Sequence, residues 1–182
     1  MKDSFKIHAD YAKKFIGWGT DRYICGAEGQ GTVEGQIRKM FEEASETQFA
    51  IAGNDKGEII DGLGDTFVTM VMVSERAGIA PERWMDRLWS GGRESMSLPV
   101  TGESDPIGFA GALLHGAAEA MDNYARGNEN GVLASLGASY VALGVIARDL
   151  GLSLAECMEA AWLEIKDRKG RMIDGKFVKE AA

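Results

Sequence analysis

Apolar residues recur every three or four positions along most of the chain, a spacing that places them on one face of an α-helix. The segment that contains Leu63, Phe67 and Met70 is typical of this pattern. Signs of strands are confined to the C-terminus, where Gly170 and Gly175 flank a short turn or hairpin. We therefore expect an all-α helical bundle, with helices near residues 4–17, 31–52, 57–77, 81–90, 106–126, 131–150 and 153–167.

The chain also contains an internal repeat. When residues 61–89 are laid on residues 134–162, six positions are identical, and the turns around Asn54 and Asn128 match within one residue. The identical pairs are Leu63 with Leu136, Gly64 with Gly137, Val68 with Val141, Gly78 with Gly151, Met85 with Met158 and Trp89 with Trp162. This match predicts a duplicated helical unit within a single domain.

The repeat divides the chain into four parts. We expect a catalytic unit at 1–90, a polar linker loop at 91–105, a degenerate scaffold unit at 106–167 and a basic tail at 168–182. The two units differ in their acidic residues, because three carboxylates of the first unit fall on Gly or Ala of the second. These pairs are Glu43 with Gly116, Asp61 with Ala134 and Asp65 with Ala138, whereas Glu46 falls on Glu119. Charges that only solvate a helix are usually exchanged for other polar residues, so this loss indicates one functional unit and one scaffold unit.

Composition restricts the class of protein. The chain has 182 residues, of which 45% are hydrophobic and 26% charged, as in one globular domain. Its formal net charge of −8 argues against a nucleic-acid polymer or an anionic membrane as partner. We see no apolar stretch of membrane-spanning length and no signal-peptide core, so we expect a cytoplasmic protein. Cys25 and Cys157 have no metal-ligand spacing and are expected to be free thiols.

Carboxylates line the facing sides of two neighbouring predicted helices. Glu43 and Glu46 share a helical stripe, with Glu42 beside them, and Asp61 and Asp65 share a stripe on the next helix. Glu58 begins that second stripe, so an antiparallel helix pair would gather four to six carboxylates. Such a concentration of like charge raises pKa values or requires a cation. Oxygen ligands without nearby His or Cys favour Mg²⁺, with Mn²⁺ as the alternative, and phosphate chemistry is the usual use of such a site.

These two segments resemble the all-α nucleoside triphosphate pyrophosphohydrolase superfamily, which includes MazG-like proteins and dimeric dUTPases. The resemblance lies in Lys39–Glu46, with its Glu-Glu-x-x-Glu, and in Glu58–Asp65, and it covers roughly residues 14–90. It implies that Glu43 and Glu46 hold magnesium together with Asp65. It also implies hydrolysis of a nucleoside triphosphate to a monophosphate and pyrophosphate.

The sequence departs from the superfamily pattern at one position. Gly62 stands three residues before Asp65, where that pattern has Glu, so we expect Asp61, on the same helix face as Asp65, as the fourth ligand, with Glu58 next. Alternatively, Glu58 and Asp61 themselves form the Glu-x-x-Asp motif and Asp65 is an additional ligand. Glu42 and Glu58 are the candidate general bases.

Several other residues are candidates for holding the substrate. Lys39 and Gln36 share the acidic helix, Trp18 and Arg22 precede it, and Asn54 lies in the turn that follows. The C-terminal run also resembles the end of MazG-like proteins, often phage-encoded, and is basic. Its members Lys166, Arg168 and Lys169, followed by Arg171 and Lys176, form a cationic tail that can fold over the carboxylates and hold a triphosphate.

The sequence thus predicts a Mg²⁺-dependent (d)NTP pyrophosphohydrolase for nucleotide pool cleaning or supply, with a nucleotide as its small-molecule partner. The resemblance further implies a homodimer. A non-catalytic helical module that binds a metal or a partner, and a hydrolase of another pyrophosphate-containing nucleotide, are the alternatives. The preferred base and sugar are not legible in the sequence.

Overall fold

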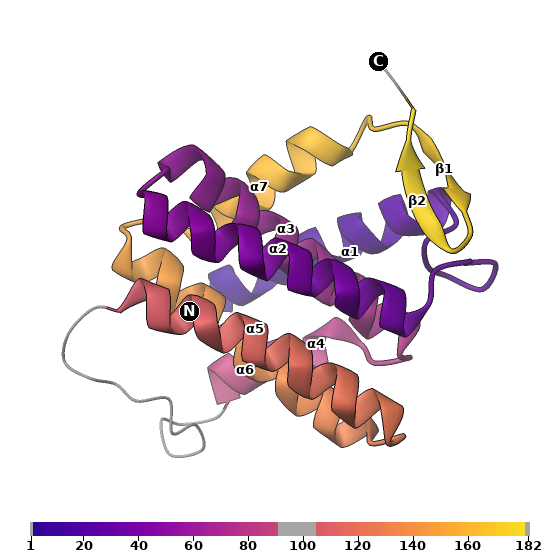
Figure 1. Ribbon diagram of the computed structural model, residues 1–182, viewed down its shortest axis with the longest axis horizontal. Coiled ribbons are helices and arrows are strands. Elements are labelled where there is room, and N and C mark those ends of the chain that lie inside the picture. Colours follow the sequence, from indigo (N-terminus) through magenta and orange to yellow (C-terminus); the bar gives the residue numbers. More distant parts are fainter. Residues whose placement is uncertain (1, 91–104, 181–182) are drawn as a thin grey trace.

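The computed structural model describes residues 2–90 and 105–180, and within them the chain is helical apart from one small hairpin. All seven predicted helices are confirmed, with boundaries shifted by a few residues. They are α1 (Lys2–Asp21), α2 (Val33–Gly53), α3 (Lys56–Arg76), α4 (Pro81–Ser90), α5 (Pro106–Ala125), α6 (Glu129–Asp149) and α7 (Leu154–Ile165) (Figure 1). The expected linker at 91–105 lies, except for Asp105, outside the described residues.

Helix boundaries follow from local side-chain chemistry. Asp55 caps α3 by accepting hydrogen bonds from the amides of Gly57 and Glu58, and Asn128 caps α6 in the equivalent turn. After α3 and α6 the chain turns at Gly78 and Gly151, with φ of +71° and +68°, a conformation that favours glycine. These glycines are equivalent positions of the repeat, so both units end their long central helix in the same way.

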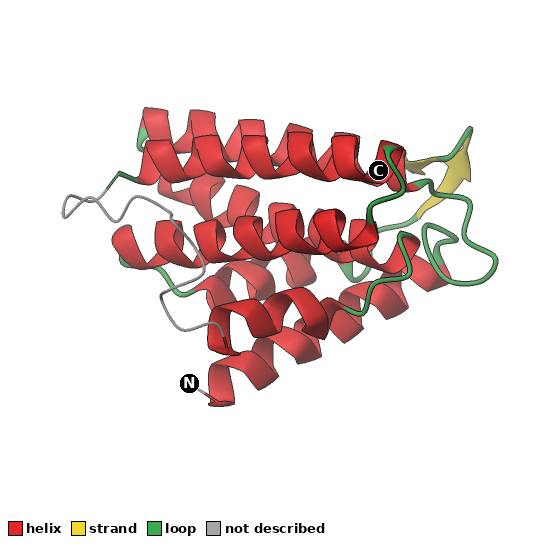
Figure 2. Ribbon diagram, turned by 90° about the horizontal axis from the view of Figure 1, so that it is seen from below, coloured by secondary structure: helices red, strands yellow, loops and turns green. Residues whose placement is uncertain are grey.

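The two halves pack on each other reciprocally. α2 pairs with α3, and α5 pairs with α6; α2 also lies against α5 (Figure 1). The short helix of each half then crosses to the other half, because α4 packs on α6 and α7 packs on α3. Viewed from the side, the helices form layers with the hairpin at one end (Figure 2). Because of this exchange of helices, each half depends on the other for its core.

An aromatic cluster joins the halves at the centre of the core. Phe67 of α3 contacts Tyr140 of α6, with ring centroids 6.1 Å apart, and these are equivalent positions of the repeat. Trp84 of α4 contacts both rings, at 5.8 and 5.4 Å, and Phe15 of α1 lies 6.2 Å from Phe67. All four side chains are fully buried. Their burial stabilises the fold by about 1.5–3 kcal/mol or more each.

The C-terminal turn predicted at Gly170 and Gly175 is an antiparallel hairpin of β1 (Gly170–Ile173) and β2 (Lys176–Lys179). It packs against the end of α1, where the rings of Phe177 and Trp18 are 5.6 Å apart. The hairpin therefore holds the chain after α7 against the end of α1.

The expectation that the chain has no apolar stretch of membrane-spanning length needs correction. By length and composition alone, α6 is apolar enough to cross a membrane. Of its most apolar window, 61% is buried inside the protein, as in the core helix of a bundle. Core packing therefore accounts for its composition.

Candidate functional site

The helix pair α2–α3 brings together four of the predicted carboxylates. Glu43 and Glu46 lie on α2, and Asp61 and Asp65 on α3. The charge of Glu43 acts on both aspartates across the pair, whereas Glu46 is exposed and interacts with Glu43 on its own helix. Glu43 is buried, with 8% of its surface exposed, while Asp61 and Asp65 are half-buried. Because burial weakens solvent screening, these charges interact more strongly than they would on a surface.

Close helix packing explains the glycine at position 62. Gly62 is buried against α2, and a Cβ added there would lie 3.1 Å from the Cα of Thr47. A glutamate at this position would have to push the two helices apart. Position 62 therefore cannot supply the fourth carboxylate in this chain, which has to come from a neighbouring position.

A fifth carboxylate, which the sequence analysis missed, comes from the second unit. Glu164 of α7 shares a hydrogen bond with the Asp61 carboxyl, and its charge also acts on Asp65. The repeat did contain a signal for it. The repeat pairs Glu164 with Gly91. Here too an acidic residue falls on a glycine, but this time the acidic residue belongs to the second half of the chain. Because α7 packs on α3, the acidic residue of this pair lies beside the carboxylates of the first half.

Another glycine sets the distance between α3 and α7. A Cβ added at Gly64 would lie 2.8 Å from the Cβ of Ala161 and would collide with the Cys157 carbonyl oxygen. The helices can approach this closely only because position 64 has no side chain. This approach brings Glu164 within reach of Asp61.

Burial and the neighbouring carboxylates raise the pKa values of three acidic groups in the cluster. Burial, followed by the interactions with Glu164, Glu58 and Glu43, raises the pKa of Asp61 from 3.8 to about 6. Burial, together with Glu43, Asp61 and Glu164, raises the pKa of Asp65 to about 7. The pKa of Glu46 is raised as well, first by burial and then by Glu43. The cluster thus carries more negative charge than its surroundings compensate.

Two cations partly balance this charge. The Lys39 ammonium lies 2.6 Å from Glu42 and 2.9 Å from Glu43. Burial opposes the charged form of Lys39, but its hydrogen bonds to these carboxylates outweigh burial and raise its pKa. Arg168 forms an ion pair with Glu164 and lowers the pKa of Asp65. Two cations thus face five carboxylates.

The donor chemistry of the cluster fits a hard divalent cation, because its groups are carboxylates with an excess of negative charge. Within residues 2–90 and 105–180, however, no group of three or more acidic, His or Cys side chains is already gathered at metal-binding distance. The residues supply suitable ligands without forming a finished coordination sphere. Side-chain rotation would be needed to complete one.

The equivalent region of the second unit is closed. A Cβ added at Gly116, the counterpart of Glu43, would collide with the Ser139 hydroxyl. Ala134 and Ala138 stand where the first unit has its aspartates. These small side chains belong to the closely packed pair of α5 and α6.

Other predicted site residues lie at the edge of the cluster. Glu58 is exposed in the first turn of α3, where its charge acts on Asp61, and Glu42 is exposed and paired with Lys39. Gln36 is half-buried one turn before Lys39 on α2. The structure therefore places Asp61 more centrally than Glu58.

Four of the predicted substrate-binding residues have other surroundings. Trp18 is buried and donates its indole N–H to the Ile165 carbonyl oxygen at 2.7 Å. Asn54 ends α2 in a left-handed conformation (φ 54°) as a turn former. Lys166 lies 4.0 Å from Asp167, and Lys169 is exposed. Of the tail residues predicted to bind substrate, Arg168 is the one whose charge acts on the cluster.

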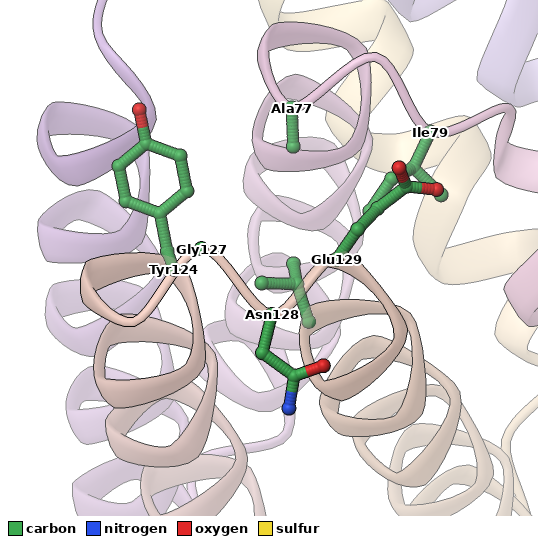
Figure 3. A pocket seen from close by; sticks show the side chains of 7 residues that line it. Ala77, Ile79, Tyr124, Gly127, Asn128 and Glu129 are labelled. Carbon is green, nitrogen blue, oxygen red and sulfur yellow. The ribbon is translucent and has the colours of Figure 1, made fainter.

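A cavity of about 140 Å³ lies at the turn between α5 and α6 (Figure 3). It is lined by Ala77, Ile79, Tyr124, Gly127, Asn128, Glu129 and Val132. None of these residues belongs to the carboxylate cluster. Pockets for whole nucleotide-sized ligands are usually about 300–1,000 Å³, so this cavity is too small to hold one.

Comparisons of the chain with protein-family models, with curated proteins and with solved structures give no match.

Proposed function

We propose that this protein is a Mg²⁺-dependent nucleoside triphosphate pyrophosphohydrolase, which converts a (d)NTP and water to a (d)NMP and pyrophosphate. One observation carries the proposal. Helices α2 and α3 gather Glu43, Asp61 and Asp65, with the exposed Glu46 beside Glu43 on α2, while three of the four equivalent positions in the second half of the chain are Gly or Ala. A fold that needed these charges only for solubility would have no reason to concentrate them where they repel.

Glu43, Glu46, Asp61 and Asp65 are the residues that would hold the cation. Asp61 is preferred over Glu58 as the fourth, because Asp61 is half-buried within the cluster and Glu58 is exposed at its edge. When bound, Mg²⁺ or Mn²⁺ neutralises charge on phosphate oxygens and lowers the pKa of a coordinated water.

The remaining residues of the site bind phosphate and accept the proton. Lys39 and Arg168 carry the positive charges nearest the cluster and would neutralise the triphosphate, whose oxygens compete for them with Glu42, Glu43 and Glu164. Glu42 and Glu58 are exposed carboxylates at the edge of the cluster, so either can accept the proton of the attacking water. Lys39 donates a hydrogen bond to Glu42 at 2.6 Å.

Pyrophosphate release from a panel of ribo- and deoxynucleoside triphosphates tests the proposal. We expect release with Mg²⁺ or Mn²⁺, none with EDTA, and loss of activity in Glu46→Gln. The matched control is Glu119→Gln, because Glu119 is the repeat equivalent of Glu46 in the scaffold unit and is exposed there. Equal effects of the two substitutions would contradict the proposal.

Silence across the whole panel would favour one of the two alternatives, another pyrophosphate-containing substrate or a non-catalytic binding module. The expected homodimer and the cytoplasmic location belong to the same proposal. Light scattering of the purified chain tests the dimer, and a monomeric mass would remove it.

A further inference from the structure

Helix α7 ends next to the carboxylate cluster, and its end needs hydrogen-bond donors. The last carbonyl groups of an α-helix have no partner within the helix and have to be satisfied by water or by side chains. Glu164 lies in the last turn of α7, Arg168 follows three residues after its end, and the charges of both act on the cluster. Whatever holds these carbonyls also sets the position of both side chains.

The donors come from the end of α1. Arg22 donates from Nε to the Arg168 carbonyl oxygen at 2.8 Å and from Nη2 to the Lys166 carbonyl oxygen at 3.1 Å. Trp18 donates from Nε1 to the Ile165 carbonyl oxygen at 2.7 Å. Three carbonyl groups at and just after the end of α7 are thus bound by Trp18, in the last turn of α1, and by Arg22, which directly follows α1.

Arg22 itself is held in place. Its Nη1 lies 3.3 Å from the Trp18 carbonyl oxygen, and its guanidinium carbon lies 4.9 Å from the centroid of the Trp18 ring. Trp18 is buried, with 8% of its surface exposed, and contacts Phe177 of the hairpin. Stacking on the Trp18 ring and the bond to the Trp18 carbonyl oxygen already orient the planar guanidinium. Arg22 therefore loses little further conformational entropy when it binds the other two carbonyl oxygens.

Arg168 is therefore fixed at both ends. Its carbonyl oxygen is bound by Arg22, and its guanidinium pairs with Glu164, whose carboxylate also bonds Asp61. A continuous chain of contacts runs from Arg22 through the backbone of Arg168 to the acidic cluster.

We infer that Arg22 is a positioning residue for the site, which holds the end of α7 so that Arg168 is directed at the phosphates of the substrate. This inference rests on the proposed function, in which Arg168 binds the triphosphate. Arg22 does not touch the substrate. Its role is to keep the Arg168 guanidinium at the carboxylates, where a phosphate group bound through a cation would be placed.

The test measures binding of inorganic tripolyphosphate with Mg²⁺ by calorimetry, so that no base has to be identified. We expect Arg22→Gln to weaken binding about tenfold, because displacement of a binding group by about 1 Å has effects of this order or larger. Arg22→Lys keeps one donor and should recover part of the loss. The matched control is Arg76→Gln, since Arg76 also donates to a loop carbonyl oxygen, that of Gly26 at 3.0 Å, without a contact to α7.

A double-mutant cycle separates positioning from a general loss of stability. In an Arg168→Gln background, Arg22→Gln should have no further effect on tripolyphosphate affinity, because the group that it positions is gone. An additive effect, or equal losses in Arg22→Gln and Arg76→Gln, would overturn the inference. Where the wild type also turns over a nucleotide, Arg22→Gln should raise KM about tenfold with little change in kcat.

The outcomes distinguish the two proposals. Tripolyphosphate binding that depends on Arg22 through Arg168, without turnover of any nucleotide, would support the positioning role and contradict the pyrophosphohydrolase. Turnover with unchanged affinity in Arg22→Gln would support the enzyme and overturn the positioning role. A wild-type protein that neither binds tripolyphosphate nor hydrolyses any nucleotide would overturn both.

Discussion

Replacing Asp65 with Asn should stabilise the protein in the absence of metal while it removes the function. The pKa of Asp65 rises on folding from 3.8 to about 7, mainly through burial and the repulsion from Glu43 and Asp61. A carboxyl whose pKa is raised by folding stabilises the protein fully below pH 3.8, and this contribution is lost as the pH rises through about 7. Above pH 7 the folded protein therefore carries an unfavourable charge, which Asn lacks.

The size of this effect follows from the two pKa values. Their difference corresponds to about 4 kcal/mol, at about 1.36 kcal/mol per pKa unit, as an upper bound. Asp65 is partly exposed and shares its repulsion with other carboxylates, so we expect a gain of about 1–2 kcal/mol in the free energy of unfolding at about pH 8. The gain should shrink toward about pH 4, where Asp65 is neutral in the folded protein.

Urea unfolding in EDTA at about pH 8 and about pH 5 measures this directly. Asp122→Asn is the control, because Asp122 is exposed in an ion pair with Arg126 and should change the free energy of unfolding by less than about 1 kcal/mol. Added Mg²⁺ should then stabilise the wild type and have little effect on Asp65→Asn. An Asn variant that is less stable than the wild type at about pH 8, or equally affected at both pH values, would refute the electrostatic reasoning.

Three further predictions follow from the packing. Gly64→Ala should destabilise the protein by about 1–3 kcal/mol, because the added methyl group collides with α7. Gly144→Ala in α6 has open space around it and should be neutral or stabilising. Chemical denaturation compares the free energies of unfolding of the two variants. Gly62→Glu introduces the acidic residue of the superfamily pattern that the sequence resembles. Because Thr47 occupies that space, this substitution should lower the melting temperature instead of improving metal binding, and a better metal affinity would disprove this. Burial lowers the pKa of His8 from 6.5 to about 4. The wild type should therefore lose up to about 3 kcal/mol of stability as the pH falls from about 6.5 to about 4, a loss absent in His8→Gln. The same dependence of the free energy of unfolding on pH in both proteins below pH 6.5 would contradict this.

Local patterns in the sequence predicted most of the fold. The helical period of Leu63, Phe67 and Met70 predicts a helix whose apolar face is buried in the structure, and the turns that contain Asn54 and Asn128 separate helices as expected. These features depend on a few neighbouring residues, so they are visible in a single chain. The repeat, a longer pattern, also anticipated the matching helix order of the two halves.

The parts that the sequence missed depend on packing between distant segments. Glu164 reaches Asp61 only because α7 crosses to the first unit and Gly64 lets it come close. The sequence makes Trp18 a candidate for holding the substrate, but in the structure its indole N–H donates to the Ile165 carbonyl oxygen at the end of α7. The spacing of residues along one helix gives no information about which other helix will cover it, and so neither contact was predictable from periodicity.

The central claim is that the cluster of Glu43, Glu46, Asp61 and Asp65 binds a divalent cation. Titration of Mn²⁺ followed by electron paramagnetic resonance tests this most directly, because it needs no substrate. The account predicts saturable binding that is lost in Asp65→Asn and retained in Glu119→Gln, whose carboxylate lies in the scaffold unit. Absence of saturable binding in the folded wild-type protein, or equal binding by both variants, would contradict the claim.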